Sequence, residues 1–185
     1  MALHEQCVGA TDEWYTPPHV FEALGEVFDL DVASPCERQY VPAKCWLTIQ
    51  DDGLKYAPFW PGFIWMNPPF GARNGLVPWL EAFFRHGNGI ALTPDRTSAP
   101  WWQDYAAKAD AILFVSPKLK FIGASGKPGN SPAQGTTLLA AGHRATCALF
   151  RAAHNGLGTF AVPQPTWKGV KGLSLPPQDS SGGAA

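Results

Sequence analysis

Apolar residues along this chain recur at two spacings, one typical of strands and the other of amphipathic helices. In the first part, short apolar runs predict three strands, in the segments "FDLDVAS", "KCWLTIQ" and "GFIWM". Ahead of them, "PPHVFEALGEVF" carries apolar residues at helical spacing, and Thr16 followed by Pro17 is typical of a helix N-cap and first helical residue. We therefore expect a helix over about residues 17–27 that leads into a strand ending near Asp31.

The second part continues this alternation of strands and helices. The segments "LVPWLEAFFRH" and "APWWQDYAAKA" predict helices, the latter with Ser98 as its cap, while "GIALTPD" and "AILFVS" predict strands. Two further apolar runs, "TTLLAAG" and "ATCALF", are typical of a hairpin. The sequence thus predicts an α/β fold, with a mostly parallel sheet, helices on both faces and an antiparallel hairpin at one edge.

Length and composition suit one globular domain. The chain has 185 residues, of which 45% are hydrophobic and 16% charged. We expect a flexible segment over residues 1–11, a single domain over residues 12–162 and a disordered tail, rich in Pro, Gly and Ser, over residues 163–185. No apolar run is long enough to span a bilayer, and the start lacks the basic and apolar regions of a signal peptide, so we expect a cytoplasmic protein.

The cysteines do not form a metal-binding or disulfide pattern. Cys7, Cys36, Cys45 and Cys147 lie far apart, with no C-x-x-C pair and no histidine at ligand spacing beside them. We expect reduced thiols and no metal site.

The net charge of −1 hides an asymmetry between the two parts of the chain. Residues 1–60 carry three basic and ten acidic side chains, whereas residues 61–185 carry eleven basic and five acidic ones. Such an asymmetry suggests an anionic partner that meets one side of the protein. Two ordinary solvated faces are the alternative.

Polar side chains follow the predicted strands at their ends. They are Asp31, Asp51 or Asp52, Asn67 and Asp95. Ligands of open α/β sheets bind outside the carboxyl ends of the strands, so one crevice could gather all of these side chains.

The segment "FIWMNPPFG" carries the most specific chemistry. Pro68 and Pro69 lack N–H groups and hold φ at about −65°, and the first of them forces Asn67 into an extended corner. The Asn67 side-chain oxygen and the Pro68 carbonyl then form a rigid pair of hydrogen-bond acceptors beside the ring of Phe70. This pair suits a planar ligand with an exocyclic amino group, because the acceptors take the two amino hydrogens and leave the nitrogen lone pair free to attack an electrophilic methyl group.

Together these motifs resemble a known enzyme family. "NPPF" after an apolar strand is similar to the D/N/S-P-P-Y/F/W motif of amino-group methyltransferases that use S-adenosylmethionine. With "YTP", "DLDVAS" and "DDGL" in this order, over roughly residues 12–160, the chain closely resembles the phage-type DNA N6-adenine methyltransferases, the small Dam-like enzymes of phages and prophages. The resemblance implies a Rossmann-like methyltransferase fold and S-adenosylmethionine as cofactor. Only 36 residues separate Asp31 from Asn67, so we expect the cofactor half of this fold to be abbreviated.

The resemblance also implies roles for single residues. Catalysis falls to the corner made of Asn67, Pro68, Pro69 and Phe70. The residues implied to bind the cofactor are Tyr15, Thr16, Pro17, Asp31, Ala33, Ser34 and one of Asp51 and Asp52. A carboxylate near ribose hydroxyls is also expected from the physics of dinucleotide sites.

Candidates for DNA contact follow Asn67, in the basic part of the chain: Arg73, Asn74, Arg96, Ser98, Lys118, Lys120 and Lys127. Ordinary surface charge is the alternative for each lysine. Double-stranded DNA as substrate requires extrusion of the adenine, since its amino group cannot otherwise meet the methyl donor.

The sequence thus predicts an adenine-specific DNA N6-methyltransferase, and two alternatives stay open. The same corner serves methylation of RNA bases or of a protein glutamine. A non-catalytic DNA-binding homologue is the other alternative, because "DLDVASPCER" lacks the glycine-rich loop that usually follows the first strand of these enzymes.

Overall fold

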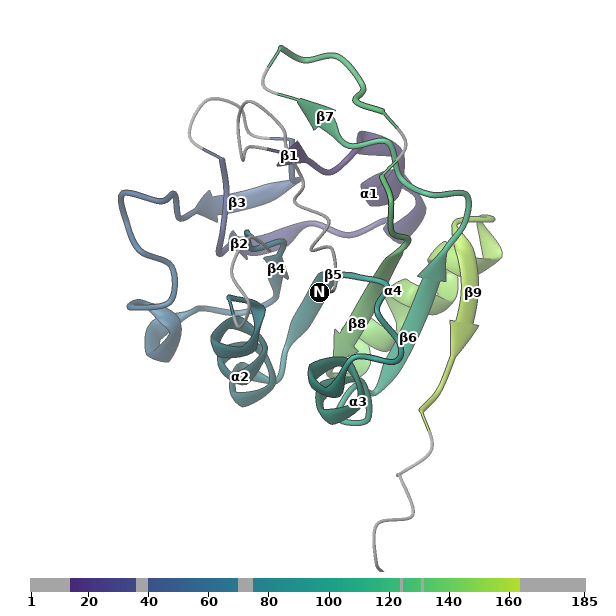
Figure 1. Ribbon diagram of the computed structural model, residues 1–185. Helices are drawn as coiled ribbons and strands as arrows, with labels where there is room; N and C mark the ends of the chain where they lie inside the picture. Colours follow the sequence, from purple (N-terminus) through teal and green to yellow (C-terminus); the bar gives the residue numbers. More distant parts are fainter. Residues whose placement is uncertain (1–13, 36–39, 70–74, 124, 131, 164–185) are drawn as a thin grey trace, which may run out of the picture.

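A central sheet organises the protein. The computed structural model describes residues 14–35, 40–69, 75–123, 125–130 and 132–163, and in them the seven-stranded sheet has the order β3-β2-β4-β5-β8-β6-β9 (Figure 1). Its strands are β2 (Phe28–Asp31), β3 (Ala43–Trp46), β4 (Ile64–Met66), β5 (Gly89–Pro94), β6 (Ala111–Val115), β8 (Thr136–Ala141) and β9 (Gly158–Ala161). β3, β2, β4 and β5 pair in parallel, whereas β8 and β9 run antiparallel to their neighbours. The sheet is therefore mostly parallel in direction, as predicted.

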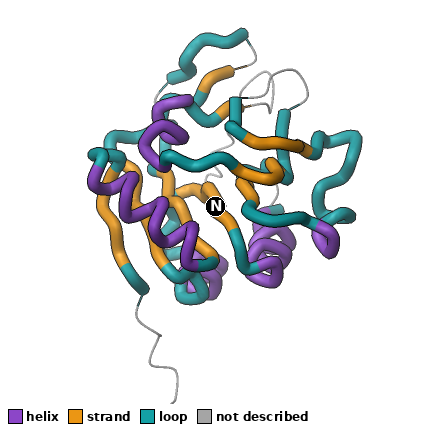
Figure 2. Tube along the Cα trace, turned by 180° about the vertical axis from the view of Figure 1, so that it is seen from behind, coloured by secondary structure: helices purple, strands orange, loops and turns teal. Residues whose placement is uncertain are grey.

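Helices cover both faces of this sheet. One face packs against α1 (Pro18–Leu24) and α4 (His143–His154), and the other against α2 (Leu76–His86), α3 (Pro100–Ala106) and the short 3-10 helix η1 (Ala57–Phe59). Figure 1 shows α2 and α3 in front of the sheet, and Figure 2, seen from behind, shows α4 lying across the strands. The prediction of an α/β fold with helices on both faces is confirmed.

The apolar run before Asn67 is buried on both sides. Successive side chains of a strand point to opposite faces, and Trp65 accordingly packs in the core under α1 and α4, while Ile64 and Met66 pack in the core under α2. All three side chains are fully buried. Packing on both faces therefore fixes the position of β4, and with it the backbone at Asn67.

A second, two-stranded sheet joins distant parts of the chain. β1 (Trp14–Tyr15), just before α1, pairs antiparallel with β7 (Ile122–Gly123), in the long loop after β6. Both lie at the top of Figure 1. The Trp14 ring lies on Gly129, where an added Cβ would come within 2.6 Å of the ring.

The expected terminal hairpin is wrong in its second strand. "ATCALF" lies within α4, whose buried residues Ala145, Ala148, Leu149 and Ala152 follow helical spacing. The antiparallel edge is instead the pair β6–β9. Small alanines hid the helical period, because the segment reads as a continuous apolar run when alanine is counted with the branched residues.

The two predicted helix caps are also wrong. α1 begins at Pro18 with Pro17 as its N-cap, α3 has Ala99 as its N-cap, and neither cap forms a side-chain hydrogen bond. A proline at the start of each helix removes one N–H that a cap would satisfy. α1 also ends earlier than expected, at Leu24, because Gly25 adopts a left-handed conformation with φ of 62° and donates its N–H to the Phe21 carbonyl.

Some expectations fall outside the described residues. These are the flexible segment over residues 1–11, the tail from residue 164 onward, and the cysteines Cys7 and Cys36. Cys45 and Cys147 are free and exposed.

Candidate active site

A small hollow lies at the carboxyl ends of β2 and β4. Asp31 is the last residue of β2, Asn67 directly follows β4, and the two strands pair with Asp31 opposite Trp65. The described residues that line the hollow are Trp14, Tyr15, Thr16, Asp31, Ala33, Pro35, Tyr40, Val41, Trp65 and Asn67. The structure therefore brings together five residues singled out in the sequence, Tyr15, Thr16, Asp31, Ala33 and Asn67.

Asp31 is a carboxyl group held in an apolar setting. It is 2% exposed, and the Ala33 N–H donates a hydrogen bond to its Oδ1 at 3.2 Å. Burial raises the pKa of Asp31 from 3.8 to about 7, and hydrogen bonds from the Ala33 N–H and the Ser34 side chain offset only part of that rise. No Lys, Arg or His is among the described residues that line the hollow, so none of them neutralises this group there.

Asn67 is held by a residue from a different part of the chain. Its Nδ2 donates a hydrogen bond to Oγ1 of Thr16 at 3.3 Å. Thr16 is 3% exposed and Asn67 is half-buried. No described residue donates a hydrogen bond to Asn67 Oδ1, which leaves that oxygen as an available acceptor. Pro68 is buried and Pro69 is exposed, while Phe70 lies outside the described residues.

Aromatic rings form the remaining wall, and sequence reasoning missed most of them. The rings of Tyr15 and Tyr40 meet edge to face, with centroids 5.0 Å apart. Trp14, which is 41% exposed, and Trp65 also line the hollow. Trp14 directly precedes the singled-out "YTP", a signal that would have found it, whereas Tyr40 and Val41 stand in a segment with no periodicity.

Other predicted residues do not reach the hollow. Asp51 is exposed, and its carboxylate accepts hydrogen bonds from the Thr48 N–H and hydroxyl, both at 2.8 Å, which lower the pKa of Asp51. Asp52 is exposed in the same turn, with φ of 57°. Pro17 and Ser34 are buried next to lining residues, and Asp95 follows β5, where its N–H donates to the Gly135 carbonyl.

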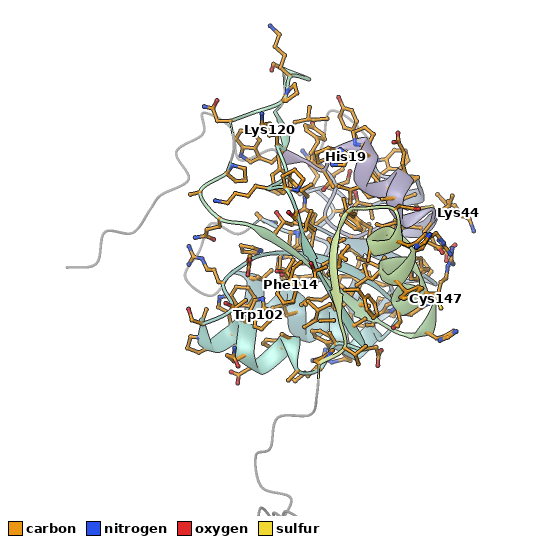
Figure 3. All side chains as sticks on the ribbon, turned by 90° about the vertical axis from the view of Figure 1, so that its right-hand side faces the viewer. His19, Lys44, Trp102, Phe114, Lys120 and Cys147 are labelled. Atoms are coloured by element: carbon orange, nitrogen blue, oxygen red, sulfur yellow. The ribbon has the colours of Figure 1, made fainter. Side chains whose placement is uncertain are left out.

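The described candidates for DNA contact lie on the loop after β5 and on the long loop after β6, and hydrogen bonds hold these loops in place. Arg96 Nε donates to Gln134 Oε1 at 2.9 Å, and Lys118 Nζ donates to the Ala133 carbonyl at 2.7 Å. Ser98, Lys120 and Lys127 are exposed, and Figure 3 shows Lys120 on a different side of the molecule from Lys44. Arg73 and Asn74 lie outside the described residues. We call the exposed set Arg96, Lys118, Lys120 and Lys127 the basic loop surface.

The described residues offer neither a metal centre nor a membrane-spanning helix. They contain no group of three or more His, Cys, Asp or Glu side chains placed to hold a metal ion. None of the helices given above has the length and apolar character needed to cross a bilayer.

Comparison with known proteins gives a family match. The family model described as DNA N-6-adenine-methyltransferase (Dam) matches residues 5–146. No curated protein and no solved structure matches the chain. The matched range holds β1 to β8, and with them every described residue that lines the hollow. Since this range covers well over half of the sequence, the chain belongs to the DNA N-6-adenine-methyltransferase (Dam) family.

Proposed function

We propose that this protein transfers the methyl group of S-adenosylmethionine to the N6 amino group of an adenine flipped out of double-stranded DNA. Membership of the Dam family supports the reaction. The observation that carries the assignment to this site is the convergence of Thr16, Asp31 and Asn67, from three separate segments, on one hollow at the carboxyl ends of β2 and β4.

The chemistry of the hollow fits this cofactor. A buried carboxyl group with no basic side chain among the described lining residues suits a ligand that brings its own positive charge and hydroxyl groups. S-adenosylmethionine carries a sulfonium, an ammonium and two ribose hydroxyls, and supplies an electrophilic methyl group when bound. Asp31 would hold its charged or hydroxyl-bearing part, with Tyr15, Thr16 and Ala33 at the wall and Pro17 and Ser34 behind it. Asp51 or Asp52 would contact the adenosine end.

The corner after β4 would hold the adenine. Asn67 Oδ1 and the Pro68 carbonyl accept the two amino hydrogens, and Phe70 stacks on the base, with Pro69 keeping the corner rigid. Two acceptors on these hydrogens favour a pyramidal nitrogen whose lone pair points at the methyl group. The corner acts through orientation and electrostatics, so no general base is needed to activate the amino group.

The basic loop surface would hold the DNA backbone. Its lysines and Arg96 lie on the loops after β5 and β6, beyond the carboxyl ends of the parallel strands where Asp31 and Asn67 also stand. Phosphate contacts of this kind fix the register of a duplex without reading its sequence. Ser98 and, next to the corner, Arg73 and Asn74 would add contacts near the extruded base.

Transfer of a labelled methyl group tests this function. Purified protein is incubated with labelled S-adenosylmethionine and unmethylated duplex DNA, and the product nucleosides are separated to identify N6-methyladenine. We expect Asn67→Ala to reduce incorporation by about 100-fold or more, because one of the two acceptors is lost. Asn155→Ala is the matched control, since that amide is exposed and donates to the Ala23 carbonyl, outside the hollow.

Three outcomes would overturn the proposal. They are no incorporation by the wild-type protein, full activity of Asn67→Ala, and faster labelling of RNA or of a protein glutamine than of duplex DNA in the same assay.

A further inference from the structure

We propose that Thr16 is a positioning residue that turns the Asn67 amide so that its oxygen faces the substrate. The proposal rests on the proposed function, because it concerns how the acceptor at Asn67 is prepared. It assigns Thr16 a task other than the cofactor contact and the helix cap expected from its place in the sequence.

The geometry around Thr16 carries this inference. The residue precedes the N-cap of α1, and no side-chain hydrogen bond is formed at that cap. Its hydroxyl instead receives the Asn67 Nδ2 hydrogen at 3.3 Å, across 51 positions of the sequence. The Thr16 side chain is buried, so it is fixed by its surroundings before any ligand arrives.

An asparagine amide has two ends of opposite character. One is an acceptor oxygen and the other a donor nitrogen, and the two have nearly the same shape. If the nitrogen faced the adenine amino group, two donors would meet and the acceptor would be lost. A partner that takes up the nitrogen leaves the oxygen pointing the other way, as in this structure.

The hydroxyl of Thr16 can hold this orientation because it has a single hydrogen. Thr16 lines the same hollow as Asp31. When its hydrogen is donated to an acceptor of the protein in the hollow, the hydroxyl can only accept from Asn67. The direction of the hydrogen bonds at Thr16 thereby decides which end of the Asn67 amide faces the adenine.

Two substitutions separate the hydroxyl from the shape of the side chain. Thr16→Val keeps the branched shape and removes the hydroxyl, whereas Thr16→Ser keeps the hydroxyl. With cofactor saturating, we expect kcat of Thr16→Val to fall about tenfold, the typical worth of one hydrogen bond, and Thr16→Ser to restore most of it. The affinity for S-adenosylhomocysteine, measured by calorimetry, should change less than about twofold. A change this small means that Thr16→Val has not removed a hydrogen bond to the ligand. Thr146→Val is the control, because this half-buried threonine of α4 also loses one hydrogen bond, to the carbonyl of the N-cap Gly142.

A second readout does not depend on activity. The side-chain amide of Asn67 gives a pair of ¹H–¹⁵N signals, which Asn67→Ser assigns by their disappearance. We expect Thr16→Val to move this pair and to speed its exchange with water, and Thr16→Ser to keep both close to the wild type. The melting temperature of each variant reports whether it is folded.

Each contrary result has its own meaning. A Thr16→Val variant that loses cofactor affinity and keeps kcat at saturation would show a cofactor contact in place of a positioning role. A Thr16→Ser variant as slow as Thr16→Val would show that the methyl group matters, and unmoved Asn67 signals would show that the hydrogen bond is absent in solution. Failure of the wild-type protein to methylate DNA would sink the proposed function alone, since the amide signals still test the pairing of Thr16 with Asn67.

Discussion

The affinity of this protein for a cationic cofactor should rise with pH because of Asp31. Burial raises the pKa of this carboxyl group from 3.8 to about 7. Of the two partners proposed for Asp31, the positively charged part of the cofactor needs the ionised carboxylate. Below the raised pKa, binding must therefore expel a proton from Asp31, and that step weakens the affinity.

The size of the effect follows from the raised pKa. A carboxyl group with a pKa near 7 is about nine-tenths protonated at about pH 6 and about one-tenth protonated at about pH 8. The dissociation constant should therefore fall about tenfold between these two conditions, with release of about one proton per ligand at the lower pH.

Asp31 also makes the stability of the ligand-free protein depend on pH. Because the folded pKa lies above the unfolded one, the native state binds the proton more tightly, and stability without ligand falls as pH rises from about 4 to about 7. The loss is at most about 4 kcal/mol. Above that range it levels off.

Calorimetry with S-adenosylhomocysteine tests the linkage. This product keeps the ammonium group, and titrations in two buffers of different ionisation heat count the protons released. Asp31→Asn should bind more weakly and lose the pH dependence. Asp104→Asn is the control, since Asp104 is exposed on α3 and does not line the hollow. A wild-type dissociation constant that does not change with pH, or an unchanged slope in Asp31→Asn, would refute the reasoning.

Two further predictions concern the surroundings of the hollow. Gly129→Ala should displace the Trp14 ring, because its Cβ would lie 2.6 Å from a ring carbon, and should weaken cofactor binding about tenfold by overpacking. Gly123→Ala is the control and should bind the cofactor normally, because its Cβ would stay 3.8 Å from the same ring. Equal affinities of the two variants would contradict this prediction. Replacing Lys120 and Lys127 by alanine should reduce the slope of log affinity for DNA against log salt concentration by about one unit each, measured by fluorescence anisotropy. Lys55→Ala is the control, since Lys55 is exposed in the acidic part of the chain. An unchanged slope in the double variant would exclude the two lysines from the interface.

The strands of the sheet could be predicted from sequence because their signals are local. "FDLDVAS", "GFIWM" and "GIALTPD" are short, strongly apolar and bounded by turn residues, and they form β2, β4 and β5. The carboxyl ends of neighbouring parallel strands meet at one edge, so the meeting of Asp31 and Asn67 followed from the strand assignments. α4 was missed because "ATCALF" reads as a continuous apolar run when alanine is counted with the branched residues.

The partners of these residues could not be predicted because they depend on tertiary contacts. Thr16 at the start of a helix is typical of a cap, and nothing within its own segment shows that its hydroxyl meets Asn67. The position of Asp51 shows the reverse effect. Its place after a strand suggested a ligand contact, and in the structure its carboxylate accepts hydrogen bonds from the N–H and hydroxyl of Thr48, three residues away in the same turn.

The small sheet of β1 and β7 joins the proposed cofactor site to the proposed DNA-binding loop in one frame. Trp14 and Tyr15 line the hollow, and their strand pairs with β7, in the loop that carries Lys118, Lys120 and Lys127. A shift of this loop toward DNA would therefore pull on the wall of the hollow, and a filled hollow would hold the loop in place. Because coupling between two binding sites is reciprocal, S-adenosylhomocysteine should tighten DNA binding by the same factor as DNA tightens the binding of S-adenosylhomocysteine. Gly129→Ala, which displaces the Trp14 ring, should reduce both tightening factors together. A change in only one of them would show that the two sites are not linked through this sheet.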